Sequence, residues 1–357
     1  MLDRRTFLSS LGLAGVSWWA APALAQSTPP MLTKAIPSSS QAIPVIGMGT
    51  WITFNVGDDP SAIRARHEVL AEFFRQGGGL VDSSPMYGSS QQVLGKILAQ
   101  MGGAPQKLFS ADKVWTGEED EGLAQLIASR KKWGVSRFDL LQVHNLIAWR
   151  AHLPLLRTIK QEGRLGHVGV TTSHGRRHDE IAQILTSESL DVVQLTYNLL
   201  DREAESRLLP LAKERGVAVI ANRPFRGGEL PERLAKKRLP SWVEPQTGCT
   251  SWPQLVLKWI VSHPAITCAI PATTRTDHMR ENMGAGRGEL PDERTREKMR
   301  EAIVAAFGDR AINRSSTTWR GLSDDEKARP VAGLLEDHPA LLKRPVIEEG
   351  GEYRQGL

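Results

Sequence analysis

The sequence has few cysteines, no basic repeat and no long unbroken apolar run. Only Cys249 and Cys268 are available for a disulfide, and we expect both to stay unpaired, because a predicted strand would bury Cys268 away from the loop that carries Cys249. The net charge of +5 at pH 7 fits an anionic ligand. Without a basic repeat or a basic groove interleaved with aromatic residues, the sequence does not predict binding to nucleic acid.

The N-terminus carries the pattern of an export signal. The run Asp3 to Leu8 contains paired arginines and precedes an apolar stretch that ends in Ala21 to Gln26. This pattern is typical of a twin-arginine signal peptide, and we expect cleavage after Ala25. The apolar stretch is interrupted by small residues, falls short of the roughly 20 apolar residues that a span needs, and has no lipobox cysteine. We therefore expect recognition by the twin-arginine export machinery and a periplasmic protein without a stable membrane anchor.

Strand-like runs alternate with helical stretches along most of the chain. Residues 62–75, 121–133 and 203–215 place apolar residues three and four apart, as in helices with one buried face. This alternation is typical of parallel βα units, and eight strands suit a closed (β/α)8 TIM barrel, for which about 250 residues are usual. The predicted strands are Val45 to Thr50, Gly79 to Ser83, Leu108 to Val114, Phe138 to His144, Gly166 to Thr171, Val192 to Tyr197, Val217 to Ala221 and Thr267 to Pro271.

An open, doubly wound sheet is the alternative fold. Its first strand-to-helix turn would carry a glycine-rich phosphate-binding loop that opens a helix. In this chain the run Gly47 to Trp51 leads into a loop instead. The closed barrel is therefore favoured.

Four chemically active side chains lie at or just beyond the ends of three successive predicted strands: Asp82, Tyr87, Lys113 and His144. The carboxyl ends of barrel strands share one mouth, so we expect these residues to meet there. A lysine at the end of an apolar strand is costly to bury without a carboxylate, and Asp82 is the candidate partner. Asp and Tyr after a strand also serve as simple turn formers, but the later lysine and histidine favour an acid/base site.

A series of short motifs lies between about Ile36 and Ala306: Ile46 to Trp51, Asp82, Tyr87-Gly88, Val93 to Gly95, Lys113, Gln142 to His144, Gly169-Val170, Gln194 to Asn198, and Ile270-Pro271 through Glu281-Asn282. In their order and spacing, these motifs resemble those of the aldo-keto reductases. The resemblance implies a (β/α)8 barrel and NADPH bound without a Rossmann motif. It also implies that Asp82, Tyr87, Lys113 and His144 form the catalytic tetrad.

The resemblance predicts an oxidoreductase that transfers hydride between NADP(H) and a small-molecule carbonyl or alcohol. Tyr87 is expected to supply the proton, and its ordinary pKa of about 10 should be lowered by Lys113, which Asp82 holds. His144 is expected to donate a hydrogen bond to the carbonyl oxygen as charge develops there. The competing hypothesis is a reductase-like barrel that keeps the cofactor as a ligand or redox sensor and acts through a protein partner.

The resemblance also places nicotinamide contacts after strands five to seven, with departures from the commonest family pattern. Thr171 keeps a hydroxyl, Thr172 replaces an amide, and Gln194 fits a second contact to the carboxamide. Asn222 stands where the family often stacks an aromatic ring, and Arg223 is a candidate pyrophosphate contact. The other residues expected near this part of the cofactor are Gly49, Thr50, Trp51, Asp82, Pro224 and Phe225.

The adenosine end of the cofactor is expected after strand eight, where hydroxyl, backbone N–H and guanidinium groups precede a helix and suit a ribose 2′-phosphate. This favours NADP over NAD, although Ala272 replaces a usual lysine and His278 a frequent arginine. The alternative is that Arg275 and His278 form a solvated helix face. The residues expected at this end are Thr273, Thr274, Arg275, Glu281 and Asn282.

Three tryptophans follow predicted strands, and we expect Trp51, Trp115 and Trp149 to wall an apolar substrate pocket. Each has a plain core position as its alternative. His174 and His178 are spaced for a metal, but the two arginines between them would repel a cation, so we interpret this stretch as a solvated helix end and expect no metal.

The last fifty residues do not fit the barrel pattern. From Ile312 to Gly351 the chain resembles the C-terminal part of arsenate-reductase-like thioredoxin-fold proteins, without the half that carries their cysteine. We interpret this tail as a fused remnant without redox activity; an unrelated helical extension is the alternative. The predicted organisation is a signal peptide over 1–25, a linker over 26–35, the barrel over 36–306 and a C-terminal extension over 307–357.

Overall fold

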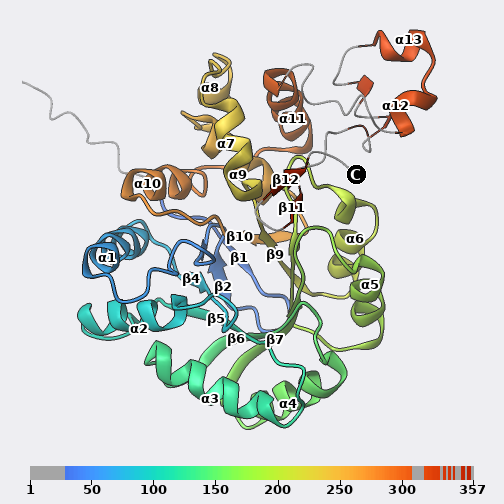
Figure 1. The fold of residues 1–357 in the computed structure, drawn as a ribbon. Coiled ribbons are helices and arrows are strands. Elements are labelled where there is room, and N and C mark those ends of the chain that lie inside the picture. The colour runs from blue at the N-terminus through green and yellow to red at the C-terminus, as the bar shows by residue number, and fades with distance from the viewer. Residues whose placement is uncertain are drawn as a thin grey trace, which may run out of the picture.

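Eight parallel strands form a barrel, and helices ring its outside (Figure 1). The structure, a computed structural model, describes residues 29–307 and, further on, 317–329, 333–334, 337–338, 341, 347–349 and 352–354. The predicted signal peptide therefore lies outside the described residues. The (β/α)8 barrel predicted from the sequence is confirmed.

All eight predicted barrel strands are present. They are β3 (Met48–Gly49), β4 (Leu80–Asp82), β5 (Phe109–Val114), β6 (Phe138–His144), β7 (Leu165–Thr171), β8 (Val192–Thr196), β9 (Ala218–Asn222) and β10 (Ile266–Ala269). Strands that are consecutive in the sequence lie side by side and pair in parallel. The ring closes where Ile46 forms a parallel bridge with Ala269, supported by a 2.9 Å bond from Gly47 N to Ala269 O.

Helices connect successive strands on the outside of the barrel. They are α1 (Pro60–Arg75), α2 (Ser90–Gln100), α3 (Glu121–Trp133), α4 (Trp149–Gln161), α5 (His178–Ser187), η1 (Glu203–Ser206), α6 (Leu208–Glu214), η2 (Arg226–Gly228), α7 (Glu229–Leu234), α8 (Val243–Thr247), α9 (Trp252–Val261), α10 (Thr276–Gly284) and α11 (Glu293–Phe307). Local signals set their ends: Asp59 caps α1 ahead of Pro60, and Gly134, with φ of 68°, ends α3. The helix predicted over 203–215 is divided, because Arg207 has a non-helical backbone between η1 and α6.

The side chains inside the barrel form an apolar layer below a polar one. Successive strand residues point to opposite faces, so residues two apart along one strand share the interior. Leu80, Phe109, Leu140 and Val192 belong to one buried apolar cluster. Two residues beyond Leu80, Asp82 therefore faces the same interior, one layer nearer the mouth. Lys113 on β5, Gln142 on β6 and Gln194 on β8 also lie an even number of residues beyond an apolar residue of this cluster, so they share the polar layer with Asp82.

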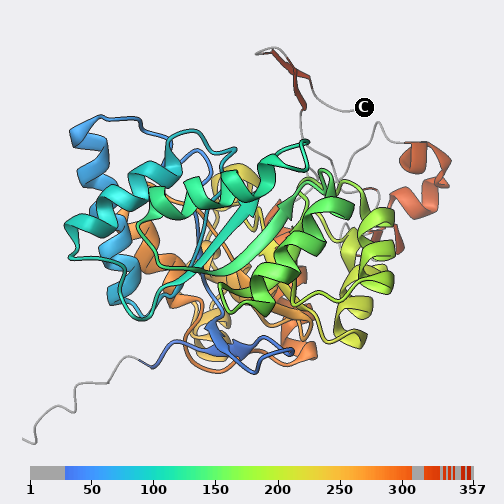
Figure 2. The ribbon, with the colours of Figure 1, turned by 90° about the horizontal axis from the view of Figure 1, so that it is seen from below.

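A hairpin of β1 (Thr33–Ala35) and β2 (Ala42–Pro44) closes the amino end of the barrel, at the bottom of Figure 2. Its residues Ile36 and Ile43 are 0% and 1% exposed and join the apolar cluster of the barrel interior. β1 lies inside the segment 26–35 that we expected to be a linker, so ordered structure begins earlier than the motifs indicate. The site must therefore lie at the other, carboxyl end.

The described parts of the C-terminal extension are short. They comprise α12 (Thr317–Gly321), α13 (Asp324–Lys327), β11 (Ile347–Glu349) and β12 (Glu352–Arg354), the last two paired antiparallel. Much of the run 312–351 lies outside the described residues, so its resemblance to thioredoxin-fold proteins stays a prediction. Cys249 and Cys268 are both buried free thiols, as expected. In the described parts of the chain, no helix is both long enough and apolar enough to cross a membrane.

Candidate active site

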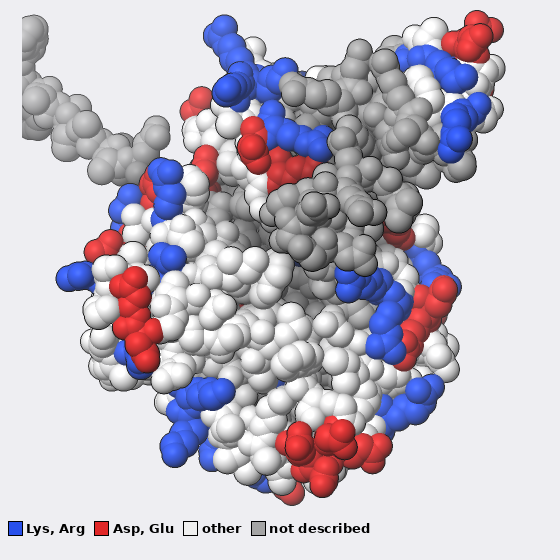
Figure 3. All heavy atoms as spheres, in the orientation of Figure 1, with Lys and Arg blue, Asp and Glu red and all other residues white. Residues whose placement is uncertain are grey.

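A cleft of about 330 Å³ opens at the carboxyl ends of the barrel strands. Residues of β3, β4, β6, β7, β8, β9 and β10, or of the loops that follow these strands, line it. On the face that Figure 3 shows, Lys, Arg, Asp and Glu side chains lie mostly toward the edges, around a broad uncharged area. Trp51, Ile52 and Met86 line the cleft and are 41, 63 and 36% exposed. The cleft thus combines a polar floor with apolar side chains at its rim.

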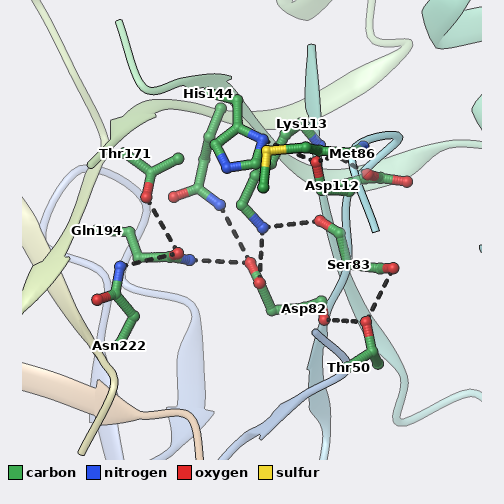
Figure 4. Close-up of polar contacts among 12 residues, drawn as sticks. Thr50, Asp82, Ser83, Met86, Asp112, Lys113, His144, Thr171, Gln194 and Asn222 are labelled. Carbon is green, nitrogen blue, oxygen red and sulfur yellow. Dashed lines mark hydrogen bonds and ion pairs between the residues drawn. The ribbon is translucent and has the colours of Figure 1, made fainter. Parts of the chain in front are cut away.

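A buried ion pair lies at the floor of the cleft (Figure 4). Lys113 Nζ is 2.6 Å from Asp82 Oδ2 and 2.7 Å from Ser83 O, and the two side chains are 0% and 2% exposed. Asp82 Oδ1 accepts hydrogen bonds from Gln194 Nε2 at 2.8 Å and Gln142 Nε2 at 3.4 Å. Burial, the largest influence, lowers the pKa of Lys113, but Asp82, through its charge and its hydrogen bond, together with Tyr87 and Asp112 outweighs burial and raises this pKa. The lysine therefore stays protonated.

Tyr87 lies beside this pair and lines the cleft. Lys113 Nζ is 5.0 Å from the centroid of its ring, and the ring of His144 meets it edge-on, with 5.8 Å between centroids. Burial raises the pKa of Tyr87 to about 12, and the charge of Lys113 offsets only part of that rise. The expected lowering of this pKa below 10 is therefore wrong for this structure, because desolvation of the phenolate outweighs the ammonium. At neutral pH Tyr87 is protonated, which is the form that gives a proton.

His144 lines the cleft at the end of β6. Its Nδ1 is 2.8 Å from Ser84 Oγ. Burial, reinforced by the charge of Lys113, lowers the pKa of His144 to about 3. The imidazole is therefore neutral at physiological pH and has one N–H group to donate.

One family of known proteins matches this chain. The model described as the Aldo/keto reductase family matches residues 45–300. The chain belongs to the aldo/keto reductase family. Methylglyoxal reductase YeaE of Escherichia coli (strain K12) is 24% identical over 252 residues, which cover 69% of this chain and 86% of that protein. The NADH-specific methylglyoxal reductase of the same strain is 22% identical over 314 residues, covering 71% and 93%.

The fold has matching solved structures. An aldo/keto reductase from Klebsiella pneumoniae, solved in complex with NADP and acetate, matches with a TM-score of 0.62 at 20% identity, covering 75% of this chain and 94% of that one. In the present chain, the mouth of the barrel brings together the four residues predicted to form the tetrad: Asp82, Tyr87, Lys113 and His144.

The residues predicted to contact the nicotinamide form a hydrogen-bonded row along one side of the cleft. Thr171 Oγ1 donates to Gln194 Oε1 at 3.0 Å, and Asn222 Nδ2 donates to the backbone oxygen of Thr172 at 2.8 Å. The Thr172 hydroxyl is buried and has no hydrogen-bond partner within the described structure. An unpaired buried hydroxyl at this position fits the carboxamide of a nicotinamide. Asn222 leaves no aromatic ring at the predicted stacking position.

Two loops on either side of the cleft carry the other predicted contacts to this part of the cofactor. Gly49, Thr50 and Trp51 line the cleft after β3, and Arg223, Pro224 and Phe225 line it after β9. Strained backbone occurs in these two loops and in those after β6 and β7: the non-glycine residues Ile52, Asn145, His174 and Arg223 all line the cleft with φ between 51° and 63°. Such strain is held only where the surroundings enforce it, and it gathers at functional sites.

The residues predicted for the adenosine end lie beyond the lining of this cleft. Arg275, whose side chain is 61% exposed, is paired with the carboxylate of Asp277 at the first turn of α10. Thr273 Oγ1 accepts a bond from Arg275 N at 3.1 Å, and Asn282 is 2% exposed. Thr274 and Glu281 are accessible to solvent. Asp277 therefore occupies Nε and one Nη of Arg275 and offsets part of the positive charge that Arg275 offers to a 2′-phosphate.

Of the three tryptophans predicted to wall the pocket, the structure places Trp51 at the cleft and the other two elsewhere. Trp149 is 6% exposed in the first turn of α4, and its Nε1 donates to Glu180 Oε1 at 2.7 Å. Trp115 is 39% exposed, and its backbone pairs with the side chain of Gln125. Position after a strand does not fix which way a large side chain turns, so the sequence pattern placed too many tryptophans at the pocket.

Other residues of the site were not predicted. Ile52, Met86 and Asn145 line the cleft, and Ser84 contacts His144. All four lie within five residues of a predicted tetrad or cofactor residue, so proximity in sequence was the available signal. His174 also lines the cleft, and no metal-binding group of histidine, cysteine or acidic residues occurs among the described residues.

Proposed function

We propose that this aldo/keto reductase reduces carbonyl compounds with NADP(H) and uses Tyr87 as the general acid. The observation that carries the proposal is the arrangement of Tyr87 and His144 on one cleft above the buried pair of Lys113 and Asp82. A proton donor, a neutral hydrogen-bond donor and a fixed positive charge are the groups that carbonyl reduction needs on the oxygen side.

NADPH, when bound, supplies a hydride to the carbonyl carbon. Tyr87 transfers its phenolic proton to the carbonyl oxygen, so that the product is an alcohol and the enzyme holds a phenolate. The Lys113 ammonium, 5.0 Å from the ring centroid, stabilises that phenolate, and Asp82 keeps Lys113 in place. His144 donates a hydrogen bond to the same oxygen and orients it toward Tyr87. In the reverse direction the phenolate takes the proton back from the alcohol.

The choice of NADP over NAD rests on the predicted group Thr273 to Arg275 and on NADP in the Klebsiella pneumoniae structure. The NADH-specific relative from Escherichia coli supports the opposite choice. The pairing of Arg275 with Asp277 weakens the positive charge available to a 2′-phosphate. We therefore propose NADP(H) as the cofactor with a modest preference over NAD(H).

The competing function is a reductase-like sensor that holds the cofactor and acts through a partner protein. The departures from the usual nicotinamide contacts at Thr172 and Asn222, where Asn222 donates to the backbone of Thr172, favour this second candidate, because a cofactor can stay bound while its nicotinamide is not held for hydride transfer. We also propose that the twin-arginine export machinery carries the folded protein to the periplasm. A cofactor bound before export would serve either function there.

The test is to release and identify any nucleotide from the protein purified folded from the periplasm, and then to follow absorbance at 340 nm with carbonyl compounds. Methylglyoxal is the first substrate, followed by a panel of aldehydes and quinones. Consumption of bound or added NADPH by a carbonyl supports the reductase. NADPH binding without turnover supports the sensor, and no binding contradicts both functions.

A further inference from the structure

Ser84 connects the two proposed proton-handling residues of the cleft. Its side chain is 0% exposed, and its Oγ lies 2.8 Å from Nδ1 of His144. Its backbone oxygen accepts the N–H of Tyr87 at 3.0 Å, within the turn that places that side chain after β4. One residue therefore contacts the ring of His144 and the backbone of Tyr87.

The hydrogen bonds of Ser84 favour one position for the hydrogen on the ring of His144. A serine hydroxyl donates one hydrogen bond and has two lone pairs for accepting. The N–H of Met86 already donates to Ser84 Oγ at 3.2 Å. Among the described residues, the hydroxyl hydrogen has one acceptor within reach, which is Nδ1 of His144. With Nδ1 accepting, the hydrogen of the neutral ring must lie on Nε2.

We propose that Ser84 is a positioning residue that holds His144 as the Nε2–H tautomer, with that N–H available to the carbonyl oxygen. The consequence for the reaction rests on the proposed reductase function; the tautomer itself does not. The opposite tautomer would turn a bare nitrogen lone pair toward the carbonyl oxygen and repel it. The hydrogen bond from the buried hydroxyl also restrains rotation of the His144 imidazole about its Cβ–Cγ bond. Ser84 thus acts on the substrate through His144.

The kinetic test compares Ser84→Ala with the conservative variant Ser84→Thr, which keeps a hydroxyl. We expect Ser84→Ala to lower kcat for methylglyoxal reduction about tenfold or more, as the loss of one buried hydrogen bond predicts, while KM for NADPH stays unchanged. Ser84→Thr should retain kcat within about threefold. The matched control is Ser110→Ala, which removes a buried serine hydroxyl bonded at 2.8 Å to Asp139 near the amino end of β5. Its kcat should equal that of the wild type.

A second measurement reads the tautomer without turnover. The ¹⁵N chemical shifts of labelled histidine, assigned to His144 by comparison with His144→Gln, should show Nδ1 without hydrogen and Nε2 with it in the wild type from pH 5 to 9. In Ser84→Ala the Nδ1 signal should shift, because its hydrogen-bond donor is lost. This readout is independent of any substrate, and the wild-type spectrum remains informative if Ser84→Ala does not fold.

The outcomes separate this inference from the proposed function. A wild-type spectrum with hydrogen on Nδ1 overturns the inference, as does a Ser84→Ala variant with wild-type kcat. A Ser84→Thr variant as slow as Ser84→Ala overturns the role of the hydroxyl. A wild type that reduces no carbonyl but shows the Nε2–H tautomer refutes the reductase and supports the assignment of Ser84 to His144.

Discussion

Replacing Asp82 by Asn removes the charge that Lys113 pairs with, and it is the sharpest test of the floor of the cleft. The amide has nearly the shape of the carboxylate, so packing is conserved. Gln194 and Gln142 donate to Oδ1, which requires the amide oxygen on that side. The amide N–H group then faces Lys113 Nζ across the distance that is now a 2.6 Å ion pair. Lys113 is left as a buried cation with Ser83 O as its contact.

Removing one partner of a buried pair costs about 3–5 kcal/mol, and we expect this loss in the free energy of unfolding at pH 7. The pH dependence of the stability that Lys113 contributes also changes sign. In the wild type the raised pKa of Lys113 contributes stability that is present below the unfolded value of about 10.4 and is lost as pH rises through the folded value. Without Asp82, we expect burial, the largest influence on Lys113, to outweigh the remaining effects of Tyr87 and Asp112 and to lower the folded pKa. The stability of the variant therefore rises toward pH 10, by at most about 1.4 kcal/mol per pH unit.

Urea unfolding followed by tryptophan fluorescence at pH 7 and pH 9 measures both effects. The control is Asp58→Asn, which breaks the surface pair with Lys96; the Asp58 side chain is 81% exposed, so a near-neutral effect without a pH trend is expected. The reasoning is refuted if Asp82→Asn destabilises no more than Asp58→Asn. It is equally refuted if the Asp82→Asn protein loses stability between pH 7 and pH 9.

Three further predictions concern the cleft. Tyr87 and His144 should add no step to the pH profile of carbonyl reduction from pH 5 to 9, because the pKa of Tyr87 is about 12 and that of His144 about 3; burial raises the pKa of Asp112 to about 7, so initial rates are compared in Asp112→Asn, where a step near neutrality contradicts the prediction. Asp277→Asn should free Arg275 and tighten NADPH binding several-fold with little effect on NADH, as measured by fluorescence titration; equal changes for both cofactors contradict the pairing argument. Trp51→Ala should raise KM for aromatic aldehydes several-fold more than for methylglyoxal in steady-state assays, and an equal effect on both argues against a pocket wall.

The fold could be predicted because each strand carries its own signal. Short apolar runs bounded by helical stretches mark the eight strands, and the period of two along each strand settles which side chains face inward. Asp82 and Lys113 follow from this rule, since each continues the inward row of its strand beyond an apolar residue. Their meeting at one mouth then follows from parallel order alone.

The rest of the site depends on side-chain directions and long-range contacts that no local pattern records. Gln194 donates to Asp82 across 112 residues of sequence, and Trp149 turns toward Glu180 instead of the cleft. The pKa of Tyr87 was mispredicted because the lysine is visible in the sequence whereas the extent of burial is not. Ser84 lies between Asp82 and Tyr87 in the sequence, but its role is visible only from the distance between its Oγ and Nδ1 of His144.

Tyr87→Phe tests the central claim most directly, because the change removes the proton donor and leaves the ring in place. The measurement is NADPH oxidation with methylglyoxal and the carbonyl panel, alongside NADPH binding by fluorescence titration. The account predicts turnover reduced to background and a dissociation constant for NADPH within about twofold of the wild type. Turnover that survives the change on every carbonyl reduced by the wild type would contradict the assignment of Tyr87 as the general acid.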